Sequence, residues 1–157
     1  MSRRLRSERG LTLTEMMVVI VIAAVLMTGV VVFYLNSQAT WLDGSTQALT
    51  QREATLVVTA IGQRAREAIG AAATPTMLTL SITQDSTYCY WWNNVGDSLV
   101  YEGQPGQGHP MCTSPAECFA VHVAGSMVYV DSLRLRSANG QRVVLGASAN
   151  MINWTRP

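Results

Sequence analysis

The sequence predicts an α+β protein in which a long N-terminal α-helix, membrane-spanning in its first half, packs on a small antiparallel β-sheet domain. Three observations predict this fold. An apolar run occupies residues 16–35, a proline-free amphipathic pattern follows to residue 70, and β-favouring segments separated by turn residues fill the remainder. At 157 residues the chain suits one compact domain and is too short for a large multidomain enzyme.

Charge is divided unevenly along the chain. The formal net charge is +1, and all eleven basic residues are arginines. Four of these arginines and one glutamate stand in the first ten residues, whereas residues 11–157 carry a net charge of −2. The body of the protein therefore lacks the basic surface of a general nucleic-acid-binding protein.

The apolar run Met16–Leu35 reads MMVVIVIAAVLMTGVVVFYL and is interrupted only by Thr28 and Gly29. Twenty helical residues rise about 30 Å, which is the thickness of the hydrocarbon layer of a bilayer. Because positively charged flanks are retained in the cytoplasm, the arginines predict a single-pass protein with a cytoplasmic N-terminus and an exported C-terminal domain.

Two alternatives stay open at this point. A conventional signal peptide would be cut after Ala39, since Ser37-Gln38-Ala39 is a small-x-small site, but its apolar stretch would span only about 7–15 residues. Nor does a signal peptide explain Glu15, a carboxylate at the edge of the run, because a charge in hydrocarbon costs free energy. The second alternative is a permanently anchored periplasmic domain that binds or transforms a ligand.

The run is preceded by Arg9-Gly10-Leu11-Thr12-Leu13-Thr14-Glu15, a segment that resembles the processing site of type IV prepilins and type II secretion pseudopilins. The resemblance implies that a membrane peptidase and methyltransferase cuts between Gly10 and Leu11 and N-methylates Leu11. It also implies that Glu15 pairs with the positive N-terminus of a neighbouring subunit during filament assembly. Leu11 replaces the commoner phenylalanine, and Thr14 replaces the usual aliphatic residue.

On this resemblance the chain is a structural subunit, and more specifically a minor one, of a type IV pilus or a type II secretion pseudopilus. The expected partners are the prepilin peptidase, other pilin or pseudopilin subunits, an inner-membrane assembly platform and the lipid bilayer, without nucleic acid. The protein would reside in the bacterial inner membrane with its head in the periplasm, and then in the filament. The tract Leu49–Ala68, which contains QREATLVVTAIGQRAREA, is similar to the corresponding helix of J-type minor pseudopilins and W-type minor pilins.

Four parts are expected along the chain: a basic leader at residues 1–10, a transmembrane or assembly half of the helix at 11–35, an amphipathic half at 36–70, and an exported β-rich head at 71–157. Gly70 is the expected helix terminator. The amphipathic stripe of the second half is expected to comprise Leu42, Leu49 and Leu56, at seven-residue spacing, and then Ala60, Ile61, Ala65, Ala68 and Ile69.

Alternating apolar residues and β-branched or aromatic residues predict the strands of the head. Tyr88, Tyr90 and Trp92 share one strand face and are expected in the core, although an exposed row would stack on sugars or single-stranded nucleic acid. Residues 97–115 are expected to be largely loop, and Asn139-Gly140 a hairpin turn. The strands are expected at Met77–Thr83, Tyr88–Trp92, Phe119–Val123, Met127–Arg136 and Arg142–Leu145.

The closest pair among the three cysteines is Cys112 and Cys118, for which a disulfide is expected outside the cytoplasm. Cys89 is then the odd thiol, although its pairing with either of the other two stays open. Together with His109 and His122 the cysteines supply residue types that suit zinc, but no Cys-x-x-Cys pair is present, so no metal and no cofactor is expected.

The sequence gives little support for calcium binding or catalysis by the head. Asp85, Asp97 and Glu102 do not form a recognisable calcium loop. The sequence contains no G-x-S-x-G motif, phosphate-binding glycine loop or Cys–His catalytic signature, so the chain is not expected to be an enzyme. The remaining candidate is a small basic face around the hairpin, formed by Arg134, Arg136 and Arg142.

Overall fold

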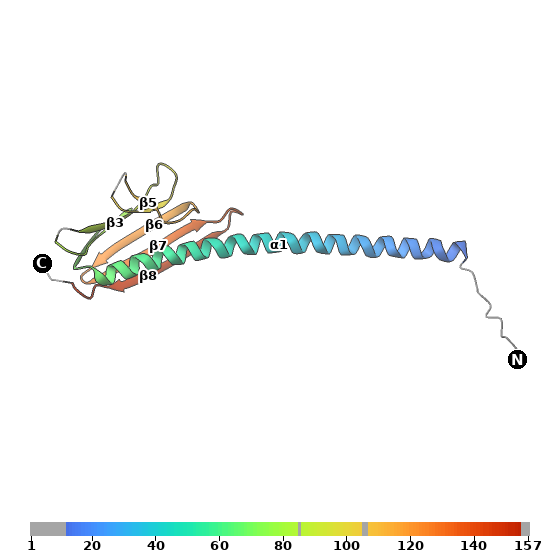
Figure 1. The fold of residues 1–157 in the computed structure, drawn as a ribbon, viewed down its shortest axis with the longest axis horizontal. Helices are drawn as coiled ribbons and strands as arrows, with labels where there is room; N and C mark the ends of the chain where they lie inside the picture. The colour runs from blue at the N-terminus through green and yellow to red at the C-terminus, as the bar shows by residue number, and fades with distance from the viewer. Residues whose placement is uncertain (1–11, 85, 105–106, 155–157) are drawn as a thin grey trace, which may run out of the picture. The chain divides into compact units, whose positions relative to one another are not determined.

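The computed structural model describes residues 12–84, 86–104 and 107–154. The chain divides into two compact units, Met1–Leu42 and Asp43–Pro157, and the α-helix α1 (Leu13–Glu67) contributes to both (Figure 1). The expected long helix is confirmed. Gly44 and Gly62 lower helix propensity without breaking α1.

The first unit is helical from Leu13 onward, and its side chains from Thr12 to Leu42 are all exposed. From Met16 to Leu42 the helix carries no charged residue. This half of α1 therefore has neither a buried face within its own chain nor a charged face toward water. It requires an apolar surrounding that the chain itself does not supply.

In the described part of the second unit, two antiparallel sheets accompany the C-terminal half of α1. Their strands follow chain order, so each neighbouring pair is joined by a local connection. The five-stranded sheet contains β1 (Gly70–Thr74), β2 (Met77–Ser81), β3 (Thr87–Trp92), β4 (Val100–Glu102) and β5 (His109–Pro110). The three-stranded sheet contains β6 (Ala116–Ala124), β7 (Met127–Arg136) and β8 (Arg142–Asn150).

The core of the second unit joins α1 to both sheets. Figure 1 shows the C-terminal half of α1 running beside β7 and β8, where Ile61 lies close to Val128 and Ala149. The helix contributes residues at three- and four-residue spacing, as an amphipathic helix packed on a sheet does. These buried positions are Thr50, Ala54, Val57, Ile61 and Ala65, and they join a core that includes Leu78, Leu80, Tyr90, Phe119, Leu133 and Leu135.

The seven-residue leucine pattern does not face this core. Leu49 and Leu56 are 60% and 58% exposed, and Leu42 is exposed as well, whereas Ile61 is buried. The expectation that the leucines share one stripe with Ile61 is therefore wrong. Consecutive residues are about 100° apart around a helix, so the burial of Val57 turns Leu56 away from the core.

The predicted strands are largely confirmed, and β7 has the expected bounds. The end of α1 differs from the prediction. Gly70 begins β1 instead of ending α1, because the Ile69 amide already donates to the Ser81 carbonyl at 2.8 Å and aligns the chain with β2. The segment at residues 97–115 is largely loop, as expected, and also contains two short strands. β4 pairs with β3, and β5 pairs with β4.

The hairpin between β7 and β8 turns at Asn139-Gly140, as expected. Gly140 has φ +81°, a left-handed conformation that glycine adopts without a steric penalty. The Ser137 amide donates to the Gln141 carbonyl at 2.8 Å across the turn. The Asn139 side-chain amide reaches the Asp43 carbonyl at 3.4 Å, which connects the hairpin to α1.

The aromatic row on β3 packs as expected. Tyr90 is completely buried, and Tyr88 and Trp92 are partly buried against the core. Trp91 points to the other face of the sheet and stacks on Tyr101, with 5.4 Å between ring centroids. The Tyr88, Tyr90 and Trp92 side chains thus serve the core and do not form an exposed stacking platform.

The C-terminal end of α1 is closed by the segment that follows β8. The Ile152 amide donates to the Arg66 carbonyl at 3.1 Å, and the Asn153 side-chain amide donates to the Glu67 carbonyl at 3.3 Å. Carbonyls in the last turn of a helix have no partner within the helix. Contacts from the far end of the head satisfy two of them here.

Glu53 links the middle of the second helical half to the loop before β6. Its carboxylate accepts hydrogen bonds from the backbone amides of Thr113, at 3.2 Å, and Ser114, at 2.9 Å, and from the Thr113 hydroxyl. Partial burial raises the pKa of the Glu53 carboxyl, but these hydrogen bonds outweigh burial and hold the pKa below its ordinary value of 4.5. The ionised form of Glu53 therefore stabilises the folded head.

This contact predicts an acid-sensitive component of stability. Because the folded pKa lies below the unfolded one, the contribution is complete above a pH of about 4.5 and is lost as the pH falls through the folded pKa. In denaturant unfolding followed by tryptophan fluorescence, the free energy of unfolding of Glu53→Gln is expected to fall less steeply with acid than that of wild type. Glu67→Gln, at an exposed carboxylate on the same helix, is the control, and parallel pH profiles for wild type and Glu53→Gln would contradict the prediction.

Candidate functional site

The first turn of α1 brings together Thr12 and Glu15. The Thr12 backbone amide and the Thr12 hydroxyl both donate to Glu15 Oε2, each at 2.8 Å. In return the Glu15 amide donates to Thr12 Oγ1 at 3.3 Å. These reciprocal bonds form a capping box, in which the residue before the helix and the third helical residue satisfy each other's backbone amides.

The capping box gives the Glu15 carboxylate a defined place. Glu15 is exposed, and it lies where the positive end of the helix dipole favours a negative charge. The carboxylate is therefore held next to the start of the helix and remains accessible from outside. Such a group can exchange local hydrogen bonds for a cation supplied by another molecule. Gly10 and Leu11, the predicted processing and methylation positions, lie outside the described residues.

Directly after Glu15 the helix becomes wholly apolar. Within the described residues, α1 is long and apolar enough to cross a membrane, and none of its most apolar window is buried in the protein. An acid at the boundary of such a segment is unusual because hydrocarbon disfavours charge. The combination of a basic segment, a helix-capping acid and an exposed apolar helix defines the candidate site.

Comparison with known proteins identifies this combination. Residues 5–31 match the family described as the prokaryotic N-terminal methylation motif. This match supports a resemblance to type IV prepilin-like proteins and pseudopilins at these residues. No curated protein and no solved structure matches the chain. The prepilin-type motif together with the apolar helix indicates a structural pilin-type protein that is processed by prepilin peptidase, and it is consistent with anchoring in the inner membrane.

The match covers the methylation motif and does not extend into the head. The resemblance of the tract Leu49–Ala68 to J-type minor pseudopilins and W-type minor pilins therefore stays a prediction. The pilin-like fold rests on the structure itself, in which a long N-terminal helix packs on antiparallel sheets.

No disulfide joins Cys112 to Cys118 in the structure, and all three cysteines are free thiols. Cys112 is buried in the core, where burial raises the pKa of its thiol. The Cys118 sulfur instead contacts the Ser132 hydroxyl at 3.3 Å across β6 and β7, and the Cys89 sulfur contacts the Thr79 hydroxyl at 3.7 Å. The two sulfurs of the expected pair thus make separate contacts, and their pairing in the exported protein stays a prediction.

The potential metal ligands of the head do not converge. Among the described residues, no group of three or more His, Cys, Asp or Glu side chains is arranged to hold a metal ion. His122 binds Asp131 at 2.7 Å and stacks on Tyr129 at an exposed position of β6. His109 lies in β5 rather than in a loop.

The acidic candidates also make local contacts. Asp97 accepts hydrogen bonds from Asn93, at 3.2 Å, and from the Tyr101 hydroxyl. Glu102 accepts one from the Tyr90 hydroxyl at 3.1 Å. Asp85 lies outside the described residues.

The expected basic face around the hairpin is partly neutralised. Arg142 pairs with Glu117, with 2.7 Å between Nε and Oε2. Arg136 lies opposite Arg142 in the register of β7 and β8, and both are exposed. Arg134 is half-buried beside Cys118 in the register. An arginine that already pairs with a carboxylate contributes little to the binding of a polyanion.

Thr12 is the functional residue that reasoning from the sequence missed. Its signal was present, because Thr12-Leu13-Thr14-Glu15 has the spacing of a capping box immediately before an apolar run. The prepilin resemblance implies only that Glu15 pairs with the N-terminus of another subunit. The structure adds that the same carboxylate has a partner within its own chain.

The capping box predicts that Thr12→Val loosens the first turn. The substitution keeps the side-chain volume but removes the hydroxyl, so the Glu15 amide loses its acceptor and the carboxylate loses one donor. Hydrogen exchange of the Glu15 amide, followed by NMR on the full chain in micelles, is expected to accelerate about fivefold. Thr28→Val is the matched control, since the Thr28 hydroxyl donates to the Ala24 carbonyl further along α1 and lies away from Glu15. Equal exchange rates at Glu15 in both variants would mean that the hydroxyl does not cap the helix.

Proposed function

We propose that the chain is a minor structural subunit of a type IV pilus or a type II secretion pseudopilus. The observation that carries the proposal is the methylation motif at residues 5–31, continuous with a helix whose apolar half has no buried face of its own. Such a helix has two suitable surroundings, lipid and the helices of other subunits. A filament subunit stored in a membrane uses both.

In this proposal prepilin peptidase cuts between Gly10 and Leu11 at the cytoplasmic face and methylates the new N-terminus at Leu11. The arginines of the leader keep that end in the cytoplasm, and the head lies in the periplasm. The inner-membrane assembly platform then transfers the subunit from the bilayer to the growing filament. The four parts of the chain are the leader at 1–10, the membrane and assembly half at 11–35, the amphipathic half at 36–70 and the head at 71–157.

Glu15 supplies the specificity of assembly. In a low-dielectric surrounding, a carboxylate and an ammonium group attract strongly, whereas an unpaired charge there is costly. The methylated N-terminus of a neighbouring subunit is such a cation. On binding it, Glu15 exchanges the Thr12 hydrogen bonds for a charge pair, which fixes the axial register of helices that otherwise meet through non-directional apolar contacts.

The exposed leucines extend the assembly surface into the second unit. Leu49 and Leu56 lie on α1 but outside the core, and they offer an apolar strip to a helix of another subunit. The head then supplies a displayed surface without enzymatic activity, cofactor or nucleic-acid partner. The minor role is favoured by the departures of Leu11 and Thr14 from the common motif and by the aromatic-rich head.

The proposal predicts the mature N-terminus. Mass spectrometry of the protein purified from its native membranes is expected to find a chain that begins with N-methylated Leu11. A strain without prepilin peptidase is the control and should retain residues 1–10. An intact leader in the presence of the peptidase would indicate a permanently anchored protein, and a chain that begins at Thr40 would indicate a conventional signal peptide. Either result would contradict the proposal.

The assembly role predicts a separate effect at Glu15. Glu15→Gln keeps the side-chain shape but removes the charge, so cleavage and methylation should proceed while incorporation into sheared filaments falls about tenfold or more. Glu67→Gln is the matched control, because it makes the same chemical change at an exposed acid near the other end of α1. Incorporation of Glu15→Gln at the level of Glu67→Gln would remove the assigned role of Glu15.

A further inference from the structure

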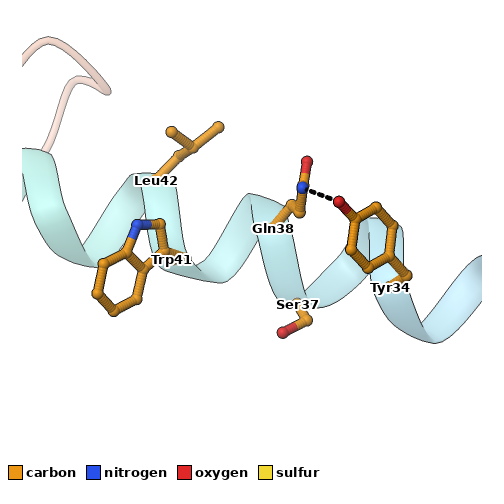
Figure 2. Close-up of a pocket in the computed structure, with 5 residues that line it drawn as sticks. All are labelled: Tyr34, Ser37, Gln38, Trp41 and Leu42. Atoms are coloured by element: carbon orange, nitrogen blue, oxygen red, sulfur yellow. Dashed lines mark hydrogen bonds between the residues drawn. The ribbon is translucent and has the colours of Figure 1, made fainter.

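The turns of α1 at the end of the apolar run carry two large aromatic side chains on one helix face. Tyr34 and Trp41 are 58% and 76% exposed, and they are seven residues apart, so they lie on the same side of the helix. With Ser37, Gln38 and Leu42 they line a shallow hollow (Figure 2). Figure 2 also shows the hydrogen bond that the Gln38 side-chain amide donates to the Tyr34 hydroxyl.

The chemistry of this face differs from that of the apolar run before it. Polar residues fill most of the positions between the two rings, and the first charged residue is Asp43. The Trp41 side chain is largely exposed, so its indole N–H is accessible to an acceptor outside the chain. Aromatic rings with a polar tip, placed between an apolar run and the first charge, are typical of the boundary between membrane and water.

The length of the helix between Glu15 and Trp41 matches the distance between the two headgroup regions of a bilayer. Glu15 and Trp41 are 26 residues apart, which is about 39 Å along an α-helix. A bilayer measures about 40–45 Å including its headgroup regions. Side chains on a helix also tilt toward the N-terminus, which brings the Trp41 ring back toward the apolar run. With Glu15 at one headgroup region, Trp41 reaches the other.

We propose that Tyr34 and Trp41 anchor α1 in the lipid headgroup region on the exported side of the bilayer and set the depth of the stored subunit. The inference rests on the proposed function, because it requires a membrane-spanning form of the chain. Trp41 donates its indole N–H to headgroup or ester oxygens, while its ring contacts the part of the acyl chains next to the headgroups. After processing, Glu15 and the positively charged N-terminus at Leu11 mark the opposite boundary, so the helix is fixed at both ends.

A helix from a second copy of the chain is the competing occupant of this face. Helix pairs pack through continuous apolar or small side chains that interdigitate. Here Ser37 and Gln38 separate the aromatic rings, and Gln38 is bonded to Tyr34 within the same helix. Leu49 and Leu56 form a better surface for a neighbouring helix. The lipid boundary, in which polar and aromatic groups mix, is the surrounding that the Tyr34–Trp41 face fits.

The test measures the depth of Trp41 in vesicles of phosphatidylethanolamine and phosphatidylglycerol doped with lipids brominated near the headgroup or near the bilayer centre. The full chain is compared with Trp41→Phe, and the difference isolates the Trp41 signal from the tryptophans of the head. Val25→Trp in the Trp41→Phe background is the depth reference, since Val25 lies in the middle of the apolar run. Shallow bromines are expected to quench Trp41 about twofold more than deep bromines, and the reverse is expected for Val25→Trp.

Each outcome bears on a different claim. Quenching of Val25→Trp by deep bromines without quenching of Trp41 by shallow ones would overturn the anchor and leave the membrane-spanning helix intact. Absence of quenching at both positions would overturn the membrane-stored form and with it the proposed function. Protection of Trp41 from acrylamide that grows with protein density, without lipid quenching, would assign the face to a second copy and also overturn the anchor.

A second measurement tests whether the aromatics set depth. In the Tyr34→Ala, Trp41→Ala background, the Val25→Trp reference is expected to lose its preference for deep bromines because the helix is free to slide. An unchanged depth profile would show that the two aromatic side chains lie at the boundary without fixing the helix there, which would overturn the anchoring role.

Discussion

An α-helix that carries no charge between Glu15 and Asp43, and that buries none of those side chains within its own chain, has to find an apolar surrounding elsewhere. The positions of the charged, polar and aromatic residues along the helix follow from this requirement. The charges stand at the two ends of the uncharged stretch, and the polar and aromatic residues near Trp41 make a gradual transition at one end. The same stretch suits lipid and a bundle of similar helices, because both offer apolar contact and neither offers water.

Beyond Asp43 the same helix serves a different purpose. The buried side chains of its second half pack against the two sheets of the head, and together they form the hydrophobic core. Glu53 binds the loop before β6, and the segment after β8 closes the end of the helix. The head therefore depends on the second half of the helix for its folding. One continuous element joins a part that folds on itself to a part that requires partners.

Periodicity in the sequence was sufficient for the helix and for the strands with alternating apolar residues, such as β7. It was insufficient for β1, because Gly70–Thr74 is rich in alanine and becomes a strand only through pairing with β2. The short strands β4 and β5 likewise depend on their neighbours. Seven-residue spacing showed that Leu49 and Leu56 share a face, but only the packed structure decides which face meets the core.

The candidate site was predictable to the extent that its signals are local. Glu15 follows from its place in the motif, and Thr12 follows from capping-box spacing. The hydrogen bond between Glu53 and Ser114 joins residues 61 positions apart, so no local sequence pattern predicts it. The same holds for the separate contacts of Cys112 and Cys118, since proximity in sequence does not fix the direction of two side chains in a folded head.

The continuity of α1 through both units has a mechanical consequence. A pulling force that reaches α1 at Asp43 acts on the head as shear, parallel to the interface between the helix and the sheets. Shear loads many apolar contacts, the Glu53 bonds and the closure at Arg66 and Glu67 at the same time, so no single contact carries the whole tension. The head can therefore stay folded while α1 is pulled along its axis.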